Sequence, residues 1–471
     1  MPQPFVLAFT KNVSLSEESS DSLVLKSPEG TFNLKQLSPG LLAAIKILSA
    51  DGGTEEYLSQ QVLQADSFSS LPKLYYYIEQ FINLGIICHT VLADGLPLAT
   101  LVPISKFEKL QFFDAKPDKK YVLSRFAYCH QGEDGMVLES PLSGAQIILT
   151  DWRSGAIATC ITKPQTASEL SNLIPGISLE TAVMFFSLLN SAAMLSEVEE
   201  DGKVVEKEND TLTQWEFHDL LFHSRSRGGR HNNPVGKSFR FVNEIKPLPV
   251  VKPKVSNDII ELYKPDIEKL KEEDYPFTRI LEERKSIRVQ GNEPITDKQL
   301  GEFLYRTARV RSIFPKDQKE CSNRPYPNGG ACYEIELYLI INSCENIPDG
   351  IYHYCPLDHQ LCKISERTTY VKALLKSAEL ATNPPCNPQI LIILASRLPR
   401  VSWNYESMAY ALTLKHVGVL YQTMYLVATA MNLAPCAVGG GNSSLFAAAT
   451  GCDYYAESSV GEFMLGSRPR N

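Results

Sequence analysis

A short basic segment, ERKSIRVQG at residues 283–291, carries the residue types that bind a phosphate group. Arg284, Lys285 and Arg288 surround one hydroxyl, that of Ser286. Arginine offers a planar fork of N–H donors, lysine a point charge, and serine a further donor to the phosphate oxygens. A solvated turn or helix end is the commoner origin of a short basic cluster, so the segment alone leaves both interpretations open.

Two glycine-containing turns later in the chain could bring backbone N–H groups close to a ligand. They are YPNGGA at residues 326–331 and AVGGGN at 437–442. Glycine lets the backbone approach a planar ligand closely, although Asn-Gly also marks ordinary turns and glycines often end helices. Neither G-x-G-x-x-G after a first strand nor G-x-x-x-x-G-K-[ST] occurs, so no Rossmann or P-loop site is predicted.

The pattern around these motifs predicts an α+β domain over residues 260–471, because helix-like and strand-like runs alternate. A central mixed sheet with flanking helices is expected. The predicted elements are helices at 296–310, 368–381 and 410–433, and strands at 332–344 and 388–397.

An internal repeat divides the first half of the chain. LVLKSPEGTFNL at 23–34 resembles MVLESPLSGAQIIL at 136–149, and three short helix-like segments follow each copy. A hairpin-like stretch follows the first set, which is the order of a winged helix. Two tandem small winged-helix-like domains are therefore predicted, over residues 1–110 and 120–200. The acidic and proline-rich stretch 201–259 is predicted to be a linker.

Charge argues against nucleic acid and an anionic membrane surface as partners. The formal net charge is -8, and the third helix of each predicted small domain has scarcely any Lys or Arg. These domains are expected instead to hold an extended peptide that adds a strand to the wing. The longest apolar stretch, 409–433, is interrupted by Lys415 and His416, which favours a buried helix over a membrane span.

Cysteine usage and the N-terminal sequence predict a cytoplasmic protein. The 11 cysteines form no C-x-x-C pair, and an odd count favours reduced thiols. No secretory signal pattern opens the sequence. Two Cys-His dipeptides, at residues 88–89 and 129–130, lack the usual spacing of zinc ligands, so no metal site is predicted.

Several motifs in a fixed order are similar to those of the flavin-dependent nitroreductase superfamily. Within it, the chain most resembles the azoline oxidases that tailor ribosomal peptides, and above all the thiazoline oxidases of cyanobactin pathways. The motifs are WEFHDLLFHSRSRGGR (215–230), RKSIR (284–288), RPYPNGGACYEIELYLI (324–340), DGIYHYCPLDHQL (349–361), NYESMAY (404–410) and GGG (439–441).

This resemblance implies an FMN enzyme that oxidises a peptide thiazoline or oxazoline to the aromatic thiazole or oxazole. It also implies a homodimer with FMN at the subunit interface, a leader peptide held by the N-terminal domains, and dioxygen as electron acceptor. The implied ligands of the phosphate and ribityl chain are Arg284, Lys285, Ser286 and Arg288, with Arg468 (or Arg470) also at the phosphate. The flavin ring would meet the backbone of Gly439 and Gly440. The other implied cofactor-binding residues are Gln422 on the long helix and Pro327, Asn328 and Gly329 in a turn contributed across the dimer.

The implied catalytic pair departs from the family pattern. Asn404-Tyr405 stands where the family carries Lys-Tyr. Aromatising an azoline requires a base, and a tyrosine with no cation beside it is a weak one. Tyr410, Lys415 or His416 could act in its place, or the acidity of the azoline itself could suffice. Tyr405 could also be only a packed aromatic residue.

Other candidate acid-base groups and functions stay open on the sequence alone. His218 and His223, in the 215–230 motif, could do chemistry or serve only as structural residues. An NAD(P)H-dependent nitro or quinone reductase of the same fold would leave the front half of the chain unexplained. A non-catalytic peptide-binding protein with an inert flavin fold is the third possibility, which the altered Lys-Tyr pair favours.

Overall fold

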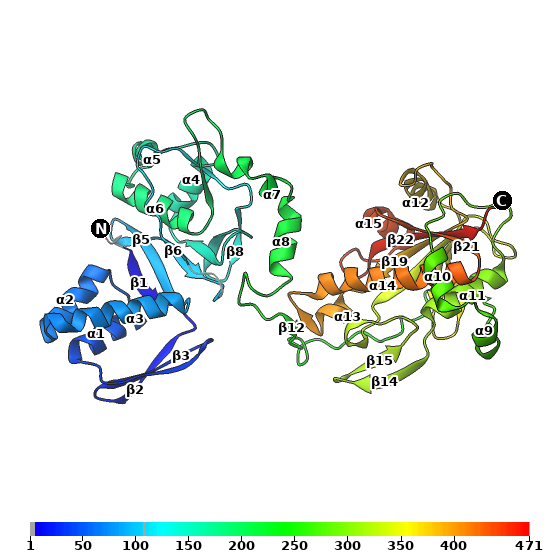
Figure 1. Ribbon diagram of the computed structural model, residues 1–471, viewed down its shortest axis with the longest axis horizontal. Helices are drawn as coiled ribbons and strands as arrows, with labels where there is room; N and C mark the ends of the chain where they lie inside the picture. The colour runs from blue at the N-terminus through cyan, green and yellow to red at the C-terminus, as the bar shows by residue number, and fades with distance from the viewer. Residues whose placement is uncertain (1–4, 107–109, 471) are drawn as a thin grey trace. The chain divides into compact units, whose positions relative to one another are not determined.

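A computed structural model describes residues 5–106 and 110–470. The chain forms two compact units, Met1–Asn233 and Pro234–Asn471 (Figure 1). The division falls inside the stretch 201–259 that was predicted to be a linker. The boundaries predicted for the smaller domains stay predictions.

The first part of unit 1 has the predicted order of three helices and a hairpin, and a further hairpin precedes the helices. The repeated segment 23–34 forms strands β3 and β4, and the three helices follow directly. The elements are β1 (Val6–Phe9), β2 (Ser14–Ser19), β3 (Ser22–Ser27), β4 (Gly30–Leu34), α1 (Pro39–Ser49), α2 (Glu55–Ala65), α3 (Leu71–Asn83), β5 (Ile87–Ala93) and β6 (Leu96–Pro103), with a 3-10 turn at Phe68–Ser70.

The second part of unit 1 repeats the hairpin and the three helices but not the second hairpin. Its repeated segment 136–149 forms β9 and β10. After the helices a single short strand, β11, pairs with β7. The elements are β7 (Tyr121–Leu123), β8 (Tyr128–Gly132), β9 (Gly135–Glu139), β10 (Ala145–Leu149), α4 (Trp152–Cys160), α5 (Ala167–Leu173), α6 (Leu179–Ser191) and β11 (Leu195–Glu197).

The two parts of unit 1 share one sheet and one hydrophobic core. The strand order of this six-stranded sheet is β1-β5-β6-β10-β9-β8, and buried residues from both helix sets form one cluster. The wing strands β5 and β6 are therefore paired on both sides, so the expectation that a peptide adds a strand to the wing is wrong. The edge strands in this sheet are β1 and β8, and β2–β3–β4 form a separate small sheet.

The segment 201–233 packs on unit 1. A 3-10 turn (Val205–Glu208) and α7 (Asp210–Thr213) lead into α8 (Phe217–Arg225). Arg225 donates to the Glu139 carboxylate at 3.0 Å, and Ser105 donates to the carbonyl of Gly229 at 2.6 Å. These contacts tie this half of the predicted linker to the strands and loops of unit 1.

Unit 2 is built on a seven-stranded sheet in which every described strand pair is antiparallel, so the predicted mixed sheet is wrong. Short loops join β16 to β17 and β17 to β18, and such loops reverse the chain direction. The order is β13 (Ile259–Glu261), β18 (Gln360–Ser365), β17 (Gly350–Cys355), β16 (Ile335–Ile341), β19 (Ile390–Ser396), β22 (Ser458–Ser467) and β21 (Leu433–Val438).

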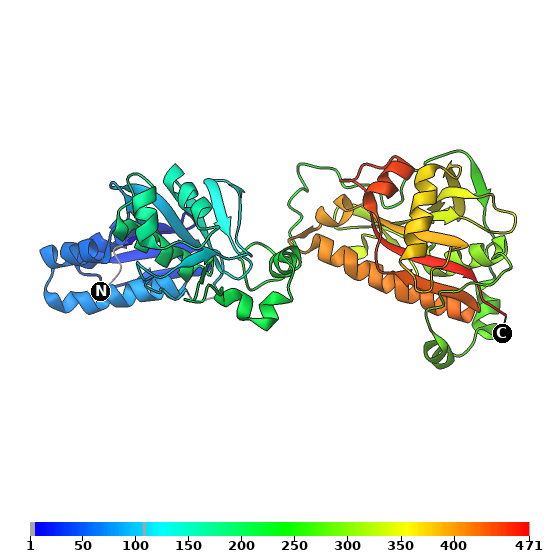
Figure 2. The ribbon, with the colours of Figure 1, turned by 90° about the horizontal axis from the view of Figure 1, so that it is seen from above.

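Helices cover both faces of this sheet (Figure 2). One core cluster lies between the sheet and the helices α11 (Asp297–Ala308) and α14 (Ala409–Ala430). The other lies between the sheet and the helices α12 (Thr369–Leu380) and α15 (Ser443–Thr450). Because alternate residues of β16 and β19 face the two clusters, both strands are buried throughout and mostly apolar. The three predicted helices and both predicted strands of this domain are confirmed.

Smaller elements surround the sheet of unit 2. They are α9 (Ile267–Glu273), α10 (Phe277–Glu283), α13 (Pro399–Ser402), a 3-10 turn (Gly329–Ala331), the hairpin β14 (Ser312–Lys316) and β15 (Lys319–Asn323), and the pair β12 (Gly236–Lys237) and β20 (Tyr405–Glu406). Among the described residues of both units, no helix combines the length and the hydropathy needed to cross a membrane.

Candidate functional site

The basic segment that follows α10 runs alongside β21. The Ile287 N–H donates to the Pro435 carbonyl at 2.8 Å, and the Gly291 N–H donates to the Ser467 carbonyl at 2.9 Å. The Ser286 and Tyr425 hydroxyls lie 2.8 Å apart, and the Tyr425 hydroxyl also accepts the Ala437 N–H at 2.8 Å. Main-chain and side-chain bonds together fix this segment against the strand.

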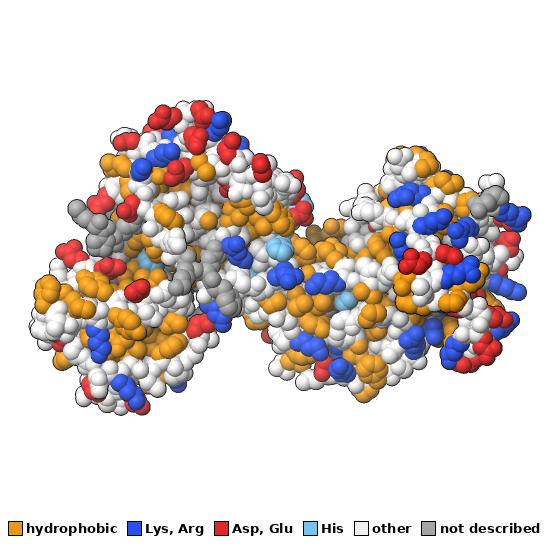
Figure 3. Space-filling view, in the orientation of Figure 1, with side chains coloured by type: hydrophobic (Ala, Val, Ile, Leu, Met, Phe, Trp, Pro, Cys, Tyr) orange, Lys and Arg blue, Asp and Glu red, His pale blue; other side chains and the backbone are white. Residues whose placement is uncertain are grey.

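The cations of this segment carry uncompensated charge. The Arg284 guanidinium lies 5.5 Å from the centre of the Tyr425 ring, while Lys285 and Arg288 are exposed. Among the ion pairs formed by residues 5–106 and 110–470, none includes any of these three side chains. Lys and Arg side chains gather around α10 and the C-terminal end in Figure 3. Cations that have no carboxylate partner are available to bind an anion.

The two C-terminal arginines differ in their partners. Arg468 donates to the side-chain oxygen of Asn432, just before β21, at 2.7 Å. Arg470 instead pairs with the Glu293 carboxylate at 2.8 Å. Both line a pocket of about 350 Å³ with residues 289–293. Because the charge of Arg470 is already neutralised, Arg468 is the better placed of the two to meet a phosphate.

The glycine run follows the other end of β21. Helix α14 ends at Ala430, so these glycines do not terminate it. Gly439 and Gly440 are exposed, and nothing lies within 4 Å of the position that a Cβ would take on either. At Gly441, by contrast, a Cβ would collide with the Glu462 carboxylate. Burial raises the pKa of Glu462 to about 7, although its bond to Ser459 opposes the shift. The open backbone of Gly439 and Gly440 leaves room for a flat ring.

The Asn-Gly turn lies against α14. The Gly329 N–H donates to Nε2 of His416 at 2.8 Å, and Nδ1 of His416 lies 2.7 Å from the Glu334 carboxylate. The Asn328 amide donates to the same carboxylate at 3.0 Å, whereas Pro327 is exposed. Burial alone would raise the pKa of Glu334, but the bond to His416 holds it below its usual value. The turn is thereby fixed to the buried His416–Glu334 pair.

Asn404 and Tyr405 lie beneath the same turn. The Tyr405 hydroxyl is 2.8 Å, and the Asn404 amide nitrogen 3.2 Å, from the position of a Cβ on Gly330, whose φ is +62°. Asn404 is fully buried and donates to the Cys332 sulfur at 3.3 Å. Its side-chain oxygen has no partner among the described residues. The Tyr405 hydroxyl thus lies directly beside Gly330, where a Cβ would collide with it.

The surroundings of Tyr405 disfavour its ionised form. Burial raises the pKa of Tyr405, and Cys332 and Asp317 raise it further, while Lys237 opposes them. Lys237 faces Tyr405 across the β12–β20 pair, and its ammonium binds the Asp317 carboxylate at 2.9 Å. Tyr405 would need a compensating positive charge to act as a base near neutral pH.

The other candidate groups are placed differently. Tyr410 is 45% exposed at the start of α14, and Lys415 and Gln422 are exposed along that helix. His416 is buried, with both ring nitrogens in hydrogen bonds.

The remaining histidine candidates belong to unit 1. His218 and His223 belong to α8 of unit 1, where His223 packs on Trp215 and His218 is exposed. The part of the chain that the structure describes holds no cluster of three metal-ligating side chains.

Helix α14 connects the two groups of residues. Its His416 holds the Asn-Gly turn, and its Tyr425 holds Ser286 and β21. These two side chains are nine residues apart, which corresponds to about 13 Å along a helix. The structure therefore brings the basic segment, Arg468 and the glycine run together around β21. It places Asn404, Tyr405 and the turn at residues 328–330 towards the first half of α14.

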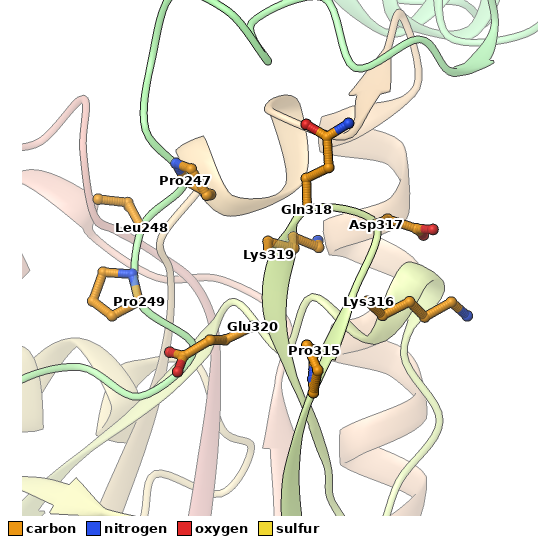
Figure 4. A pocket seen from close by; sticks show the side chains of 9 residues that line it. All are labelled: Pro247, Leu248, Pro249, Pro315, Lys316, Asp317, Gln318, Lys319 and Glu320. Carbon is orange, nitrogen blue, oxygen red and sulfur yellow. The ribbon is translucent and has the colours of Figure 1, made fainter.

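A pocket of about 570 Å³ opens beside the β14–β15 hairpin (Figure 4). Its walls are residues 247–249, which include two prolines, and hairpin residues 315–320. Asp317 and Lys319 belong to both the pocket and the surroundings of Tyr405. Four residues around Tyr405 could not be identified from the sequence, because no motif marks a residue that only the fold brings there. They are Lys237, Lys319, Cys332 and Glu334.

Comparison with known families covers nearly the whole chain. Residues 1–112 match the ThcOx helix-turn-helix domain, residues 121–232 match the cyanobactin oxidase ThcOx, and residues 281–467 match the nitroreductase family. The chain belongs to the cyanobactin oxidase family. As a member of this family it is a nitroreductase-type oxidoreductase that oxidises azolines in ribosomally made peptides.

Individual relatives match parts of this cyanobactin oxidase. A Methanocaldococcus jannaschii protein named as a nitroreductase is 28% identical over 185 residues, which is 39% of this chain and 85% of the relative. The microcin B17-processing protein McbC of Escherichia coli is 30% identical over 115 residues, which is 23% of this chain and 42% of McbC. A Desulfovibrio desulfuricans nitroreductase solved in complex with FMN has 13% identity and a TM-score of 0.28, covering 42% of this chain and 88% of that chain.

Proposed function

We propose that this cyanobactin oxidase holds FMN along β21 and uses it to convert peptide thiazolines and oxazolines into thiazoles and oxazoles. The observation that carries the FMN site is the set of unpaired cations, Arg284, Lys285 and Arg288, fixed against the strand that ends in the open glycines. In this arrangement the basic segment and Arg468 hold the phosphate. The backbone of Gly439 and Gly440 supports the flavin ring.

The chemistry divides between the cofactor and the chain. Aromatising an azoline ring removes one proton from Cα and one hydride from the neighbouring carbon. FMN, when bound, accepts the hydride. Tyr405 takes the Cα proton, and its hydroxyl lies close to Asn404 and Gly330. Dioxygen then takes up the two electrons, together with two protons, as hydrogen peroxide.

We further propose a homodimer in which the turn at residues 327–329 completes the flavin site across the interface. The polar atoms of Asn328 and the Gly329 N–H are already bound to Glu334, Tyr333 and His416 in this chain. The turn is therefore rigid before any cofactor binds, which lowers the entropic cost of completing the site.

The leader of the precursor peptide is proposed to bind unit 1. Because β5 and β6 are interior strands, the leader adds to a free sheet edge, either β8 or the small β2–β3–β4 sheet. The side chains of β8 are mostly exposed, which leaves this edge accessible on unit 1. A fluorescent leader peptide should bind the full chain in an anisotropy titration, and absence of binding would exclude this role.

A visible absorption spectrum of the purified protein, followed by anaerobic addition of a thiazoline-containing peptide, tests the proposed reaction. Flavin bands that bleach with the peptide and return with air are expected. Rapid bleaching by NAD(P)H without peptide would point to a nitro or quinone reductase instead. A colourless protein that added FMN cannot restore would leave the basic segment as a surface feature and favour a peptide-binding protein.

A further inference from the structure

Lys319 is a buried lysine beside the Asn404–Tyr405 pair. It begins β15 directly after the two-residue turn Asp317–Gln318, in which both φ angles are positive. Such a turn matches the twist of a tight hairpin. Lys319 is only 7% exposed, whereas its partner in the ladder, Lys316, is exposed.

The ammonium group of Lys319 has an unusual environment. Its hydrogen-bond acceptor is the Cys332 sulfur, at 3.3 Å. Within the described residues it forms no ion pair with a carboxylate. Burying an ammonium group without a counter-ion is costly, and a thiol is a weak acceptor. A group kept in this state is a candidate for function rather than for stability.

Cys332 and Asn404 lie between Lys319 and the surroundings of Tyr405. The Lys319 ammonium and the Asn404 amide share the Cys332 sulfur as acceptor, each at 3.3 Å. The Asn404 amide nitrogen and the Tyr405 hydroxyl both lie close to the position that a Cβ on Gly330 would take, at 3.2 and 2.8 Å. The buried side chains of Cys332 and Asn404 therefore link the positive charge to the surroundings of the half-buried phenol.

The other titratable or charged side chains packed around this cluster are Lys237, Asp317, Cys321, Cys332, Glu334 and Arg400. Most of these charged groups are neutralised by an ion pair or held by hydrogen bonds. Lys237 pairs with Asp317, and Glu334 pairs with His416. Arg400 donates to the carbonyls of Cys332, Leu248 and Glu320. Burial raises the pKa of Cys332, so its thiol is neutral near pH 7.

We propose that Lys319 is the positioning residue whose positive charge stabilises the ionised form of Tyr405 and thereby prepares it to remove the azoline proton. This inference rests on the proposed function, because it assigns the base of that reaction. Electrostatic support of this kind is stronger in a buried cluster than at the surface. It also accounts for an unpaired ammonium group in a site that contains a neutral asparagine at position 404.

The experiment compares Lys319→Met, Lys319→Arg and Lys237→Met with the unchanged protein, and uses Lys372→Met on α12 as the matched exposed control. For each protein, ultraviolet absorbance is titrated with pH and the titration of the same protein carrying Tyr405→Phe is subtracted. This difference isolates the ionisation of Tyr405. The FMN content and the pH profile of thiazoline-peptide oxidation are measured on the same samples.

Lys319→Met should raise the pKa of Tyr405 by about one unit or more and move the rising limb of the pH–rate profile by the same amount. Lys319→Arg should restore both, and Lys372→Met should change neither. Lys237→Met should have the smaller effect, because Asp317 already neutralises that charge. If Lys319→Met fails to fold, Lys319→Gln replaces it.

An unchanged Tyr405 titration in the folded Lys319→Met protein would overturn the inference, as would a larger shift in Lys237→Met. A protein that binds no FMN would refute the proposed function separately. The tyrosine titration would still decide the role of Lys319 in that case.

Discussion

Replacing Arg288 with alanine tests the cofactor site most directly. Arg288 is exposed, and among the described residues it has no ion-pair partner, so its removal should leave the fold intact. A hydrogen bond to a charged group contributes about 1.5–3 kcal/mol. Since about 1.4 kcal/mol corresponds to a factor of ten in affinity, Arg288→Ala should weaken FMN binding by roughly ten- to a hundredfold.

The assay is a titration of FMN-free protein with FMN, followed by the quenching of flavin fluorescence. Arg470→Ala is the matched control, because Arg470 is also an exposed arginine of unit 2 but is already paired with Glu293. Salt should weaken binding to the unchanged protein more than to Arg288→Ala. If Arg288→Ala and Arg470→Ala bind FMN equally well, the phosphate does not lie on the basic segment.

Three further outcomes are expected. Tyr405→Phe should keep FMN but slow azoline oxidation by about a hundredfold or more; an unchanged rate would exclude Tyr405 as the base. Glu462 keeps its proton up to about pH 7 in the folded chain but only to about 4.5 when unfolded, so the free energy of unfolding should fall by about 2–3 kcal/mol as pH rises through that window. Denaturant titrations should show Glu462→Gln gaining stability over the unchanged protein at pH 8 relative to pH 4, and an equal difference at both pH values would contradict this. Gly330→Ala should displace the Tyr405 hydroxyl and lower the rate with FMN retained, whereas Gly228→Ala, where a Cβ meets nothing within 4 Å, should not.

The sequence predicted the elements of the fold better than their pairing. The helix over 296–310 and the strand over 388–397 were recognisable because hydrophobic periodicity and length are local properties. The direction of the strands in the central sheet is not local. A mixed sheet was expected, whereas the loops at residues 342–349 and 356–359 reverse the chain and make the pairs antiparallel. The burial of β5 and β6 inside one shared sheet likewise depends on contacts between distant segments.

The candidate site likewise contains residues that local sequence reveals and residues that only tertiary contacts reveal. Arg284, Lys285 and Arg288 were found because they are adjacent in sequence and their charges need no tertiary contact to be noticed. Whether they are neutralised by carboxylates could be learned only from the fold. Lys319 could not be distinguished from Lys316 on the sequence. Only the surrounding fold buries one ammonium group and leaves the other in solvent.

Because different residues of helix α14 hold the cofactor site and the Tyr405 cluster, substitutions should affect FMN binding and proton removal independently. The basic segment depends on Tyr425 and β21, whereas the Tyr405 cluster depends on the turn that His416 holds. Effects at sites that are well separated and share no contacts add. A change at Arg288 should therefore alter the affinity for FMN without altering the ionisation of Tyr405. The neutral Asn404 does not make the flavin fold inert on this view, because the hairpin supplies the missing charge from Lys319.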